Sequence, residues 1–447
     1  MSMCRRLGAL AALTAGFVGA FALPALAAQD EATIDSGNTA WILVSAALVM
    51  FMTPGLAFFY GGLVRQKNVL STIMHCFMAL GAVTIIWVVI GHTLAFGPDQ
   101  GSVIADGGWL GGLDYLGFRT VGDAPYAPLS IPHSTFAIYQ MMFAVITPAL
   151  IAGTYAERIK FSAYLVFTAA WVIVVYAPVA HWVWGGGLLG LSGLGALDFA
   201  GGTVVHQNAG AAALAAAFCL GRRKGYPQES MLPHNVPFVV LGASILWFGW
   251  FGFNGGSALA SDGFASLAFS NTHIATAAAI FGWILPEWFQ HKKPTTVGAA
   301  TGAVAGLVAI TPASGYVRPW SSLIIGFAAG FICYFAVNLK RRFNYDDSLD
   351  VVGVHYVGGL IGAVLTGVFA TKSAISPLGG LVYTGKFDQV LKQLVASGIT
   401  TVWAFVLSFA IFKLIDWTIG LRVSQEDETT GLDLTQHGEA GYTMVGA

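Results

Sequence analysis

The chain of 447 residues is 56% hydrophobic and only 10% charged, whereas a soluble domain carries roughly 25% charged residues. This composition excludes a water-soluble globule and a disordered chain, and the balance of 21 basic against 22 acidic residues, without a basic block, excludes a nucleic-acid partner. A multi-pass membrane protein remains, and its 56 glycines would let membrane helices pack closely.

The N-terminal 28 residues have the pattern of a secretory signal. Arg5 and Arg6 precede an apolar stretch at 7–23, and Ala25-Leu26-Ala27 forms an A-x-A cleavage site. We therefore predict a signal peptide at 1–28 that is cleaved, which places the mature N-terminus outside the cytoplasm. The alternative is an uncleaved first transmembrane helix.

Eleven apolar segments follow the leader, and each approaches the length of about 20 residues that a transmembrane helix needs. Their apolarity is continuous, whereas the strands of a membrane barrel alternate between apolar and polar residues. The sequence thus predicts an all-α membrane protein with spans at 39–63, 70–96, 133–155, 161–184, 201–220, 234–256, 271–290, 297–313, 319–338, 351–371 and 394–418.

The basic residues predict the orientation of these spans. With the N-terminus outside, the loops after spans 1, 3, 5, 7 and 9 are cytoplasmic, and they hold most of the Lys and Arg residues. This indicates a cell (inner) membrane protein with the C-terminus in the cytoplasm. Eleven spans allow a five-plus-five inverted repeat, and two pairs of segments echo each other: 59–62 with 253–256, and 206–210 with 355–359.

Histidines are the main ionisable side chains inside the spans, where such groups are costly and tend to be functional. His206 and His355 occupy matching places in the proposed repeats, so two imidazoles on facing helices would share one proton. They meet only if both helices begin deep in the protein, with vestibules lined by 185–202 and 344–350. For the other three, packing is the simpler interpretation: His75, His92 and His181.

Two further features have open interpretations. Asp198 precedes span 5, where it would cap the helix or, if buried, attract cations. Aromatic residues gather near the predicted outer ends of spans, which is typical of an interfacial belt or of a cation–π cage. Composition alone does not separate the two readings for Trp182, Trp184, Trp247, Trp250, Phe251 and Phe253.

Several motifs occur in a fixed order at 58–65, 67–70, 156–159, 198–210, 250–257 and 350–355. With them, the chain resembles the ammonium transporter family, in the Amt branch of the Amt/Mep/Rh superfamily, over residues 38–420. The resemblance implies an ammonium-transporter fold of eleven helices with a five-plus-five inverted repeat, assembled as a homotrimer. It also implies an ammonium transporter that recruits ammonium at an outer aromatic site, deprotonates it and conducts ammonia through a hydrophobic pore, with possible coupled proton transfer.

The resemblance also assigns residues. Tyr139 matches one more aromatic position of the outer site, where its hydroxyl is a mild departure. The remaining assignments are the pore's twin histidines His206 and His355, the gate Phe143 and Phe253, the ammonium-recruitment residues Phe143, Trp184 and Ser257, and the acidic residue below that site, Asp198.

Residues 421–447 form a polar tail that we expect in the cytoplasm. The simpler interpretation is a solvated, partly disordered end. In similar proteins the tail and cytoplasmic loops meet neighbouring protomers and a P-II nitrogen-regulatory protein, so the resemblance implies such a partner.

Two other functions remain as alternatives. One is an ammonium sensor that signals through the tail, and the other is a b-type cytochrome whose intramembrane histidines bind haem. No nucleophile–base motif indicates an enzyme, and no cysteine pair has the spacing of a metal site. We predict a transporter without catalytic residues, metal or cofactor, whose partners are ammonium or ammonia and membrane lipid.

Overall fold

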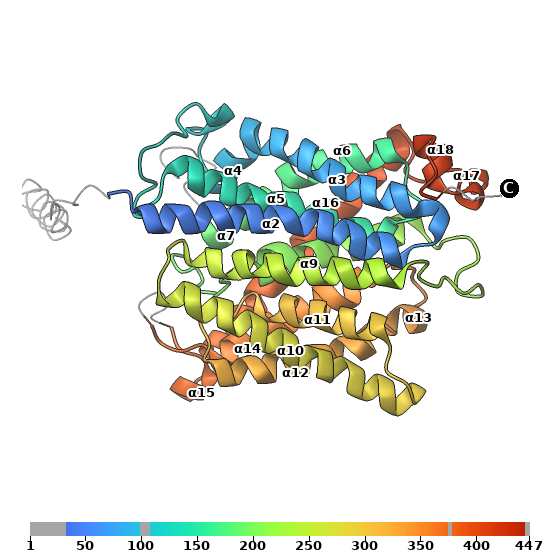
Figure 1. Ribbon diagram of the computed structural model, residues 1–447. Coiled ribbons are helices and arrows are strands. Elements are labelled where there is room, and N and C mark those ends of the chain that lie inside the picture. The colour runs from blue at the N-terminus through green and yellow to red at the C-terminus, as the bar shows by residue number, and fades with distance from the viewer. Residues whose placement is uncertain (1–32, 99–107, 374–377, 443–447) are drawn as a thin grey trace, which may run out of the picture.

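The computed structural model describes residues 33–98, 108–373 and 378–442. The predicted signal peptide lies outside the described residues. Within the described ranges, eleven helical segments run through one bundle (Figure 1). Ten of them are long and apolar enough to cross a membrane, and the eleventh is the shorter apolar helix at Thr296–Ile310. The eleven predicted spans are therefore confirmed.

Several spans are built from more than one helical piece. In chain order the segments are α2 (Ser36–Leu63); η2, α3, η3 and α4 (Gln66–Asn68, Val69–Ile86, Trp87–Gly91 and His92–Phe96); α5 (His133–Tyr155); α6, η5 and α7 (Phe161–Trp171, Val172–Tyr176 and Ala177–Trp184); η6 and α8 (Gly202–Gln207 and Asn208–Leu220); α9 and η7 (Val236–Gly255 and Gly256–Ala258); α10 (Gly263–His291); α11 (Thr296–Ile310); α12 and α13 (Pro319–Ala336 and Leu339–Phe343); η8 and α14 (Val352–Tyr356 and Val357–Phe369); and α16 (Asp388–Thr418). Short helices η4 (Leu116–Phe118), α15 (Leu381–Thr384), α17 (Gln425–Thr430) and α18 (Leu432–His437) lie between or after the spans.

The first spans of the two halves, α2 and α9, run side by side through the middle of the bundle (Figure 1). Glycines allow this close approach, as is common between membrane helices. A Cβ atom at Gly62 would lie 2.6 Å from the backbone oxygen of Asn235, and one at Gly242 would lie 2.2 Å from the backbone nitrogen of Phe59. These contacts pair the end of α2 with the start of α9, so the two helices are antiparallel.

The fifth spans of the two halves also contact each other reciprocally. Both begin with a π-helical turn, η6 or η8, which is rare and often marks a functional site. A Cβ atom at Gly210 of α8 would touch Tyr356, and one at Gly359 of α14 would lie 3.1 Å from the Cβ of His206. Each helix thus presents a glycine to the π-turn of the other. This reciprocity supports the predicted inverted repeat.

The end of the bundle that carries the C-terminal tail, called here the tail end, holds a buried ion network. The Glu157 carboxylate pairs with Arg65 at 2.8 Å and with Arg223 at 3.1 Å, and Arg223 also pairs with Asp346 at 2.9 Å. Burial opposes ionisation of both carboxyls, but hydrogen bonds and charge from Arg223 hold the pKa of Asp346 at about 2, and Arg223 and Arg65 lower that of Glu157. Both acids stay ionised and tie the loops together.

The tail is folded onto this end of the bundle as far as the structure describes it (Figure 1). The buried carboxylate of Glu428 accepts hydrogen bonds from the backbone N–H of Lys224 at 2.6 Å and from Arg422 Nη2 at 2.6 Å. Asp433 accepts one from the backbone N–H of Ser71. The expectation of a solvated, partly disordered tail is therefore wrong for residues 425–437, because these buried hydrogen bonds hold the segment in place.

Candidate functional site

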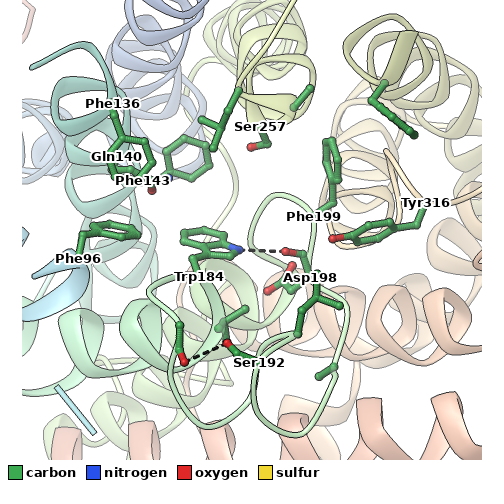
Figure 2. A pocket seen from close by; sticks show the side chains of 17 residues that line it. Phe96, Phe136, Gln140, Phe143, Trp184, Ser192, Asp198, Phe199, Ser257 and Tyr316 are labelled. Atoms are coloured by element: carbon green, nitrogen blue, oxygen red, sulfur yellow. Dashed lines mark hydrogen bonds between the residues drawn. The ribbon is translucent and has the colours of Figure 1, made fainter. Parts of the chain in front are cut away.

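A cavity of about 310 Å³ opens at the end of the bundle opposite the tail, and we call it the vestibule. Aromatic rings from α4, α5 and α7 form one wall, and the loop 185–201 forms another (Figure 2). Phe143, Trp184 and Ser257 all line this space, as the resemblance implied. The rings of Phe143 and Trp184 meet edge to face with centroids 5.8 Å apart. The structure thus brings the three expected recruitment residues together.

Beneath the vestibule, the rings of Phe143 and Phe253 lie against each other, with centroids 4.3 Å apart and planes tilted by 35°. Phe143 lines the vestibule, whereas Phe253 lines a second, narrow cavity on the other side. The ring pair therefore separates the two spaces, which is the arrangement expected of a gate.

The second cavity has a volume of about 10 Å³, which is room for about one water-sized molecule. Its walls are apolar side chains from α2, α5, α9 and α11, and the only ionisable groups among its lining residues are His206 and His355. A bare charge in such a space is costly. A hydrated ion does not fit, but a small neutral molecule does.

His206 and His355 face each other in this cavity. Their rings are stacked with centroids 5.4 Å apart, and their Nδ1 atoms are 3.3 Å apart. One Nδ1 must donate and the other accept, so the pair shares one proton along this contact. Nε2 of His206 is buried and has no partner among the described residues, and Trp250 stacks on the same ring. The prediction that the two imidazoles meet is confirmed.

Asp198 lies at the floor of the vestibule and begins the helix that carries His206. Its two carboxylate oxygens accept four backbone N–H groups, from Gly201, Gly202, Thr203 and Val204, at 2.7–3.1 Å. Its backbone oxygen accepts a hydrogen bond from the indole of Trp184 at 2.9 Å. With its carboxylate fully engaged, Asp198 caps the π-helical turn and positions both the histidine below and the tryptophan above.

Tyr139 is buried beside the recruitment residues and does not line the vestibule. Its hydroxyl lies 2.9 Å from the backbone oxygen of Phe253 and 3.2 Å from the Ser257 hydroxyl. Ser257 in turn donates to Phe253 O at 2.8 Å. The phenolic hydroxyl therefore supports Ser257 from behind, so this residue orients the site and adds no ring to it.

The other predicted aromatics have separate surroundings. Trp250 and Phe253 line the narrow cavity, whereas Trp182 packs against Trp109 and Trp403. Trp247 and Phe251 pack on α10. Of the six candidates, Trp184 alone lines the vestibule.

Sequence reasoning missed part of the vestibule wall. Phe136 and Gln140 precede Phe143 by two turns and one turn of α5 and line the same cavity. Their spacing places all three on one helical face, so the sequence spacing relative to Phe143 predicts that Phe136 and Gln140 line the same cavity. Tyr316, in the turn between α11 and α12, and Phe96, in α4, also line the cavity, and only the tertiary structure brings those two there.

A second histidine pair lies behind the vestibule wall. The Nε2 atoms of His92 and His133 are 2.9 Å apart, and both rings are enclosed by aromatic side chains such as Tyr115 and Tyr126. Neither histidine lines the vestibule or the narrow cavity. The packing interpretation of His92 agrees with this enclosure, while the partnership with His133 was not predicted.

Comparison with known proteins indicates the same family as the sequence motifs. Residues 40–442 match the model of the Ammonium Transporter Family. The chain is 50% identical to an ammonium transporter of Bacillus subtilis over 91% of its length and 98% of that protein, and 47% identical to one of Aquifex aeolicus over 96% and 99%. Its fold is similar to the crystal structure of Candida albicans Mep2, with a TM-score of 0.81 and 36% identity over 91% of this chain and 90% of that one. It is also similar to a solved sensor Amt protein, with a TM-score of 0.81 and 31% identity over 90% of this chain and 98% of that one.

Proposed function

This chain belongs to the ammonium transporter family, and from that premise we propose how it selects and conducts its substrate. It is a multi-pass membrane protein that transports ammonium and is not an enzyme. The observation that supports this proposal is the Phe143–Phe253 ring pair above a narrow, apolar cavity with two facing histidines.

Recruitment takes place in the vestibule. The faces of Phe143 and Trp184 replace part of the water around ammonium through cation–π contacts, which are worth about 0.5–2 kcal/mol each. The Ser257 hydroxyl accepts one N–H. Potassium has the same charge and a similar size, but it has no hydrogen to donate, so Ser257 favours ammonium.

Deprotonation follows from the narrow cavity. Because its apolar walls disfavour charge, ammonium becomes a stronger acid as it passes the gate. The neutral ammonia then crosses, guided by the donor and acceptor nitrogens of His206 and His355. Potassium cannot become neutral and is rejected. The imidazole pair also relays the released proton across its Nδ1–Nδ1 contact, so proton transfer is coupled to the passage of ammonia and transport carries charge.

The arrangement in the cell is part of this proposal. Cleavage of residues 1–28 leaves the mature N-terminus outside, and the tail end faces the cytoplasm. The protomers form a homotrimer in the inner membrane, each with its own pore. A P-II nitrogen-regulatory protein binds the cytoplasmic face near the folded tail.

Reconstituted protein tests the mechanism. On a solid-supported membrane, an ammonium pulse should give a current in wild-type proteoliposomes, and the same amount of potassium should give none. His206→Ala should lose deprotonation-dependent selectivity, so that potassium also evokes current. If wild type gives no current, charge-coupled transport is wrong. If His206→Ala still excludes potassium and moves ammonium normally, the histidine's role is wrong.

A sensor is the second candidate, because a solved sensor Amt protein shares the fold and the tail is anchored on the bundle through Glu428. In a pure sensor, ammonium occupancy would change the tail without flux. Ammonium uptake by purified protein in liposomes separates the two, since a sensor without transport would give no uptake.

A further inference from the structure

Gln140 is a buried polar side chain in the wall of the vestibule. It lies on α5 one turn before Phe143, lines the vestibule and is only 7% exposed. Its Oε1 atom has no hydrogen-bond partner among the described residues. Leaving a buried polar atom unpaired is unfavourable, and such groups in proteins need an explanation. A ligand in the vestibule would supply a partner for this oxygen once the carboxamide turns the oxygen toward the cavity.

The amide can present either of its ends to that ligand. Its oxygen and nitrogen have nearly the same shape, so a half-turn about the last side-chain bond exchanges them without displacing neighbours. A cation with N–H groups selects the orientation in which the oxygen faces the cavity. This choice costs no protein hydrogen bond at Oε1, because that atom makes none.

The hydroxyls of Ser192 and Tyr316 also line the vestibule but lie away from Phe143 (Figure 2), and two of the other polar groups are already engaged. Asp198 uses both carboxylate oxygens to hold four backbone N–H groups, and the Trp184 indole donates to a backbone oxygen. Ser257 gives its proton to Phe253 O, which leaves its oxygen free to accept. Gln140 and Ser257 are therefore the two side chains beside Phe143 that can accept from a bound cation (Figure 2).

We propose that Gln140 is a specificity-determining residue of the recruitment site, whose carboxamide oxygen accepts a second N–H from the cation held by Ser257. This inference rests on the proposed recruitment site and deepens it. Two acceptors beside two aromatic rings distinguish cations by the number of N–H groups they carry. Ammonium has four and satisfies both acceptors, whereas trimethylammonium has one and satisfies only one. The site accordingly prefers ammonium over trimethylammonium, which has fewer N–H groups than the site has acceptors.

The test compares Gln140→Met, which keeps the length but removes the acceptor, with wild type and with Ser257→Ala. Ammonium-evoked current in proteoliposomes gives the half-saturating concentration, and methyl-, dimethyl- and trimethylammonium are then applied as competitors. A lost hydrogen bond to a charged group weakens binding by roughly tenfold or more. In Gln140→Met we expect that rise for ammonium, larger than any change in maximal current, and a change below about twofold in the inhibition by trimethylammonium, whose single N–H needs only one acceptor.

A second variant guards against misfolding and structural effects. Gln140→Glu keeps the shape and an acceptor, so its half-saturating ammonium concentration should stay at or below the wild-type value. The proposal is overturned if Gln140→Met leaves the ammonium value unchanged, if it weakens all the ions equally, or if Gln140→Glu weakens ammonium as much as Met does. If Ser257→Ala is also without effect, the recruitment site itself is wrong, whereas an effect of Ser257→Ala alone leaves that site in place and removes only Gln140.

Discussion

Asp198 and Asp347 hold equivalent places in the two halves of the protein, each eight residues before a pore histidine. Asp198 accepts the N–H groups at the start of η6, and Asp347 accepts the N–H of Val352 at the start of η8 at 2.7 Å. A carboxylate therefore anchors each π-helical turn that carries His206 or His355. The facing imidazoles depend on two buried caps at opposite ends of the pore.

Asp198→Asn should destabilise the protein and impair transport. An amide keeps one acceptor oxygen and turns an NH2 group toward the other backbone N–H donors, so two charge-assisted hydrogen bonds are lost. A cost of about 3 kcal/mol or more is expected, together with displacement of His206. Thermal unfolding of detergent-solubilised protein and uptake into liposomes measure both effects.

Asp347→Asn is the matched comparison, because Asp347 holds one backbone N–H and the Thr154 hydroxyl and should lose less stability than Asp198→Asn. An unchanged unfolding temperature in Asp198→Asn, combined with weaker ammonium binding, would instead identify Asp198 as a direct ligand.

Tyr139→Phe should raise the half-saturating ammonium concentration about two- to tenfold, which corresponds to the loss of roughly one hydrogen bond. The phenolic hydroxyl supports Ser257 and lies beside the backbone oxygen of Phe253, so its removal frees Ser257 to turn away from the cation. Current measurements in proteoliposomes give the value. Tyr334→Phe, which removes a hydroxyl that donates to Gln290, is the control and should behave as wild type. Equal behaviour of the two variants would contradict the supporting role.

Acid should destabilise the tail end through Asp346. Its pKa is about 2 in the folded protein, against an ordinary value of 3.8. The unfolded chain therefore binds the proton more readily, so this contribution to stability is present above about pH 4 and is lost as the pH falls toward 2. Thermal unfolding between pH 7 and pH 2 measures the decline.

Asp346→Asn should be less stable than wild type at pH 7 and should show a shallower decline in acid. Asp123→Asn, which changes an exposed aspartate, should follow the wild-type curve. A decline in Asp346→Asn as steep as that of wild type would assign the acid sensitivity to other groups.

Glu428→Gln should loosen the tail. The carboxylate accepts from Lys224 N and pairs with Arg422, and an amide loses the charge that holds the guanidinium. Limited trypsin digestion should cut after Arg422, the last basic residue of the chain, several times faster in this variant than in wild type. Glu426→Gln, at an exposed position of α17, should be cut at the wild-type rate. A tail that is equally resistant in both variants would show that Glu428 does not anchor it.

Much of the fold could be read from the sequence because the signals are local. Continuous apolarity located all eleven spans, and the motif around His206 identified the helix that faces the pore. The tail was harder, since its polar composition suited a solvated end as well as a docked one. Its anchor is the contact of Glu428 with a loop some 200 residues earlier in the chain, and no local sequence pattern predicts such a contact.

The sequence by itself determined which segments are apolar enough to span a membrane and which side chains could bind a cation or carry a proton, because hydropathy and chemical type belong to each residue. Only the tertiary structure decided that His206 and His355 meet, that the Asp198 carboxylate accepts four backbone N–H groups, and that Oε1 of Gln140 has no partner within the described part of the chain. These outcomes depend on helices packing at close range across the two halves, so they arise from contacts between residues far apart in the chain.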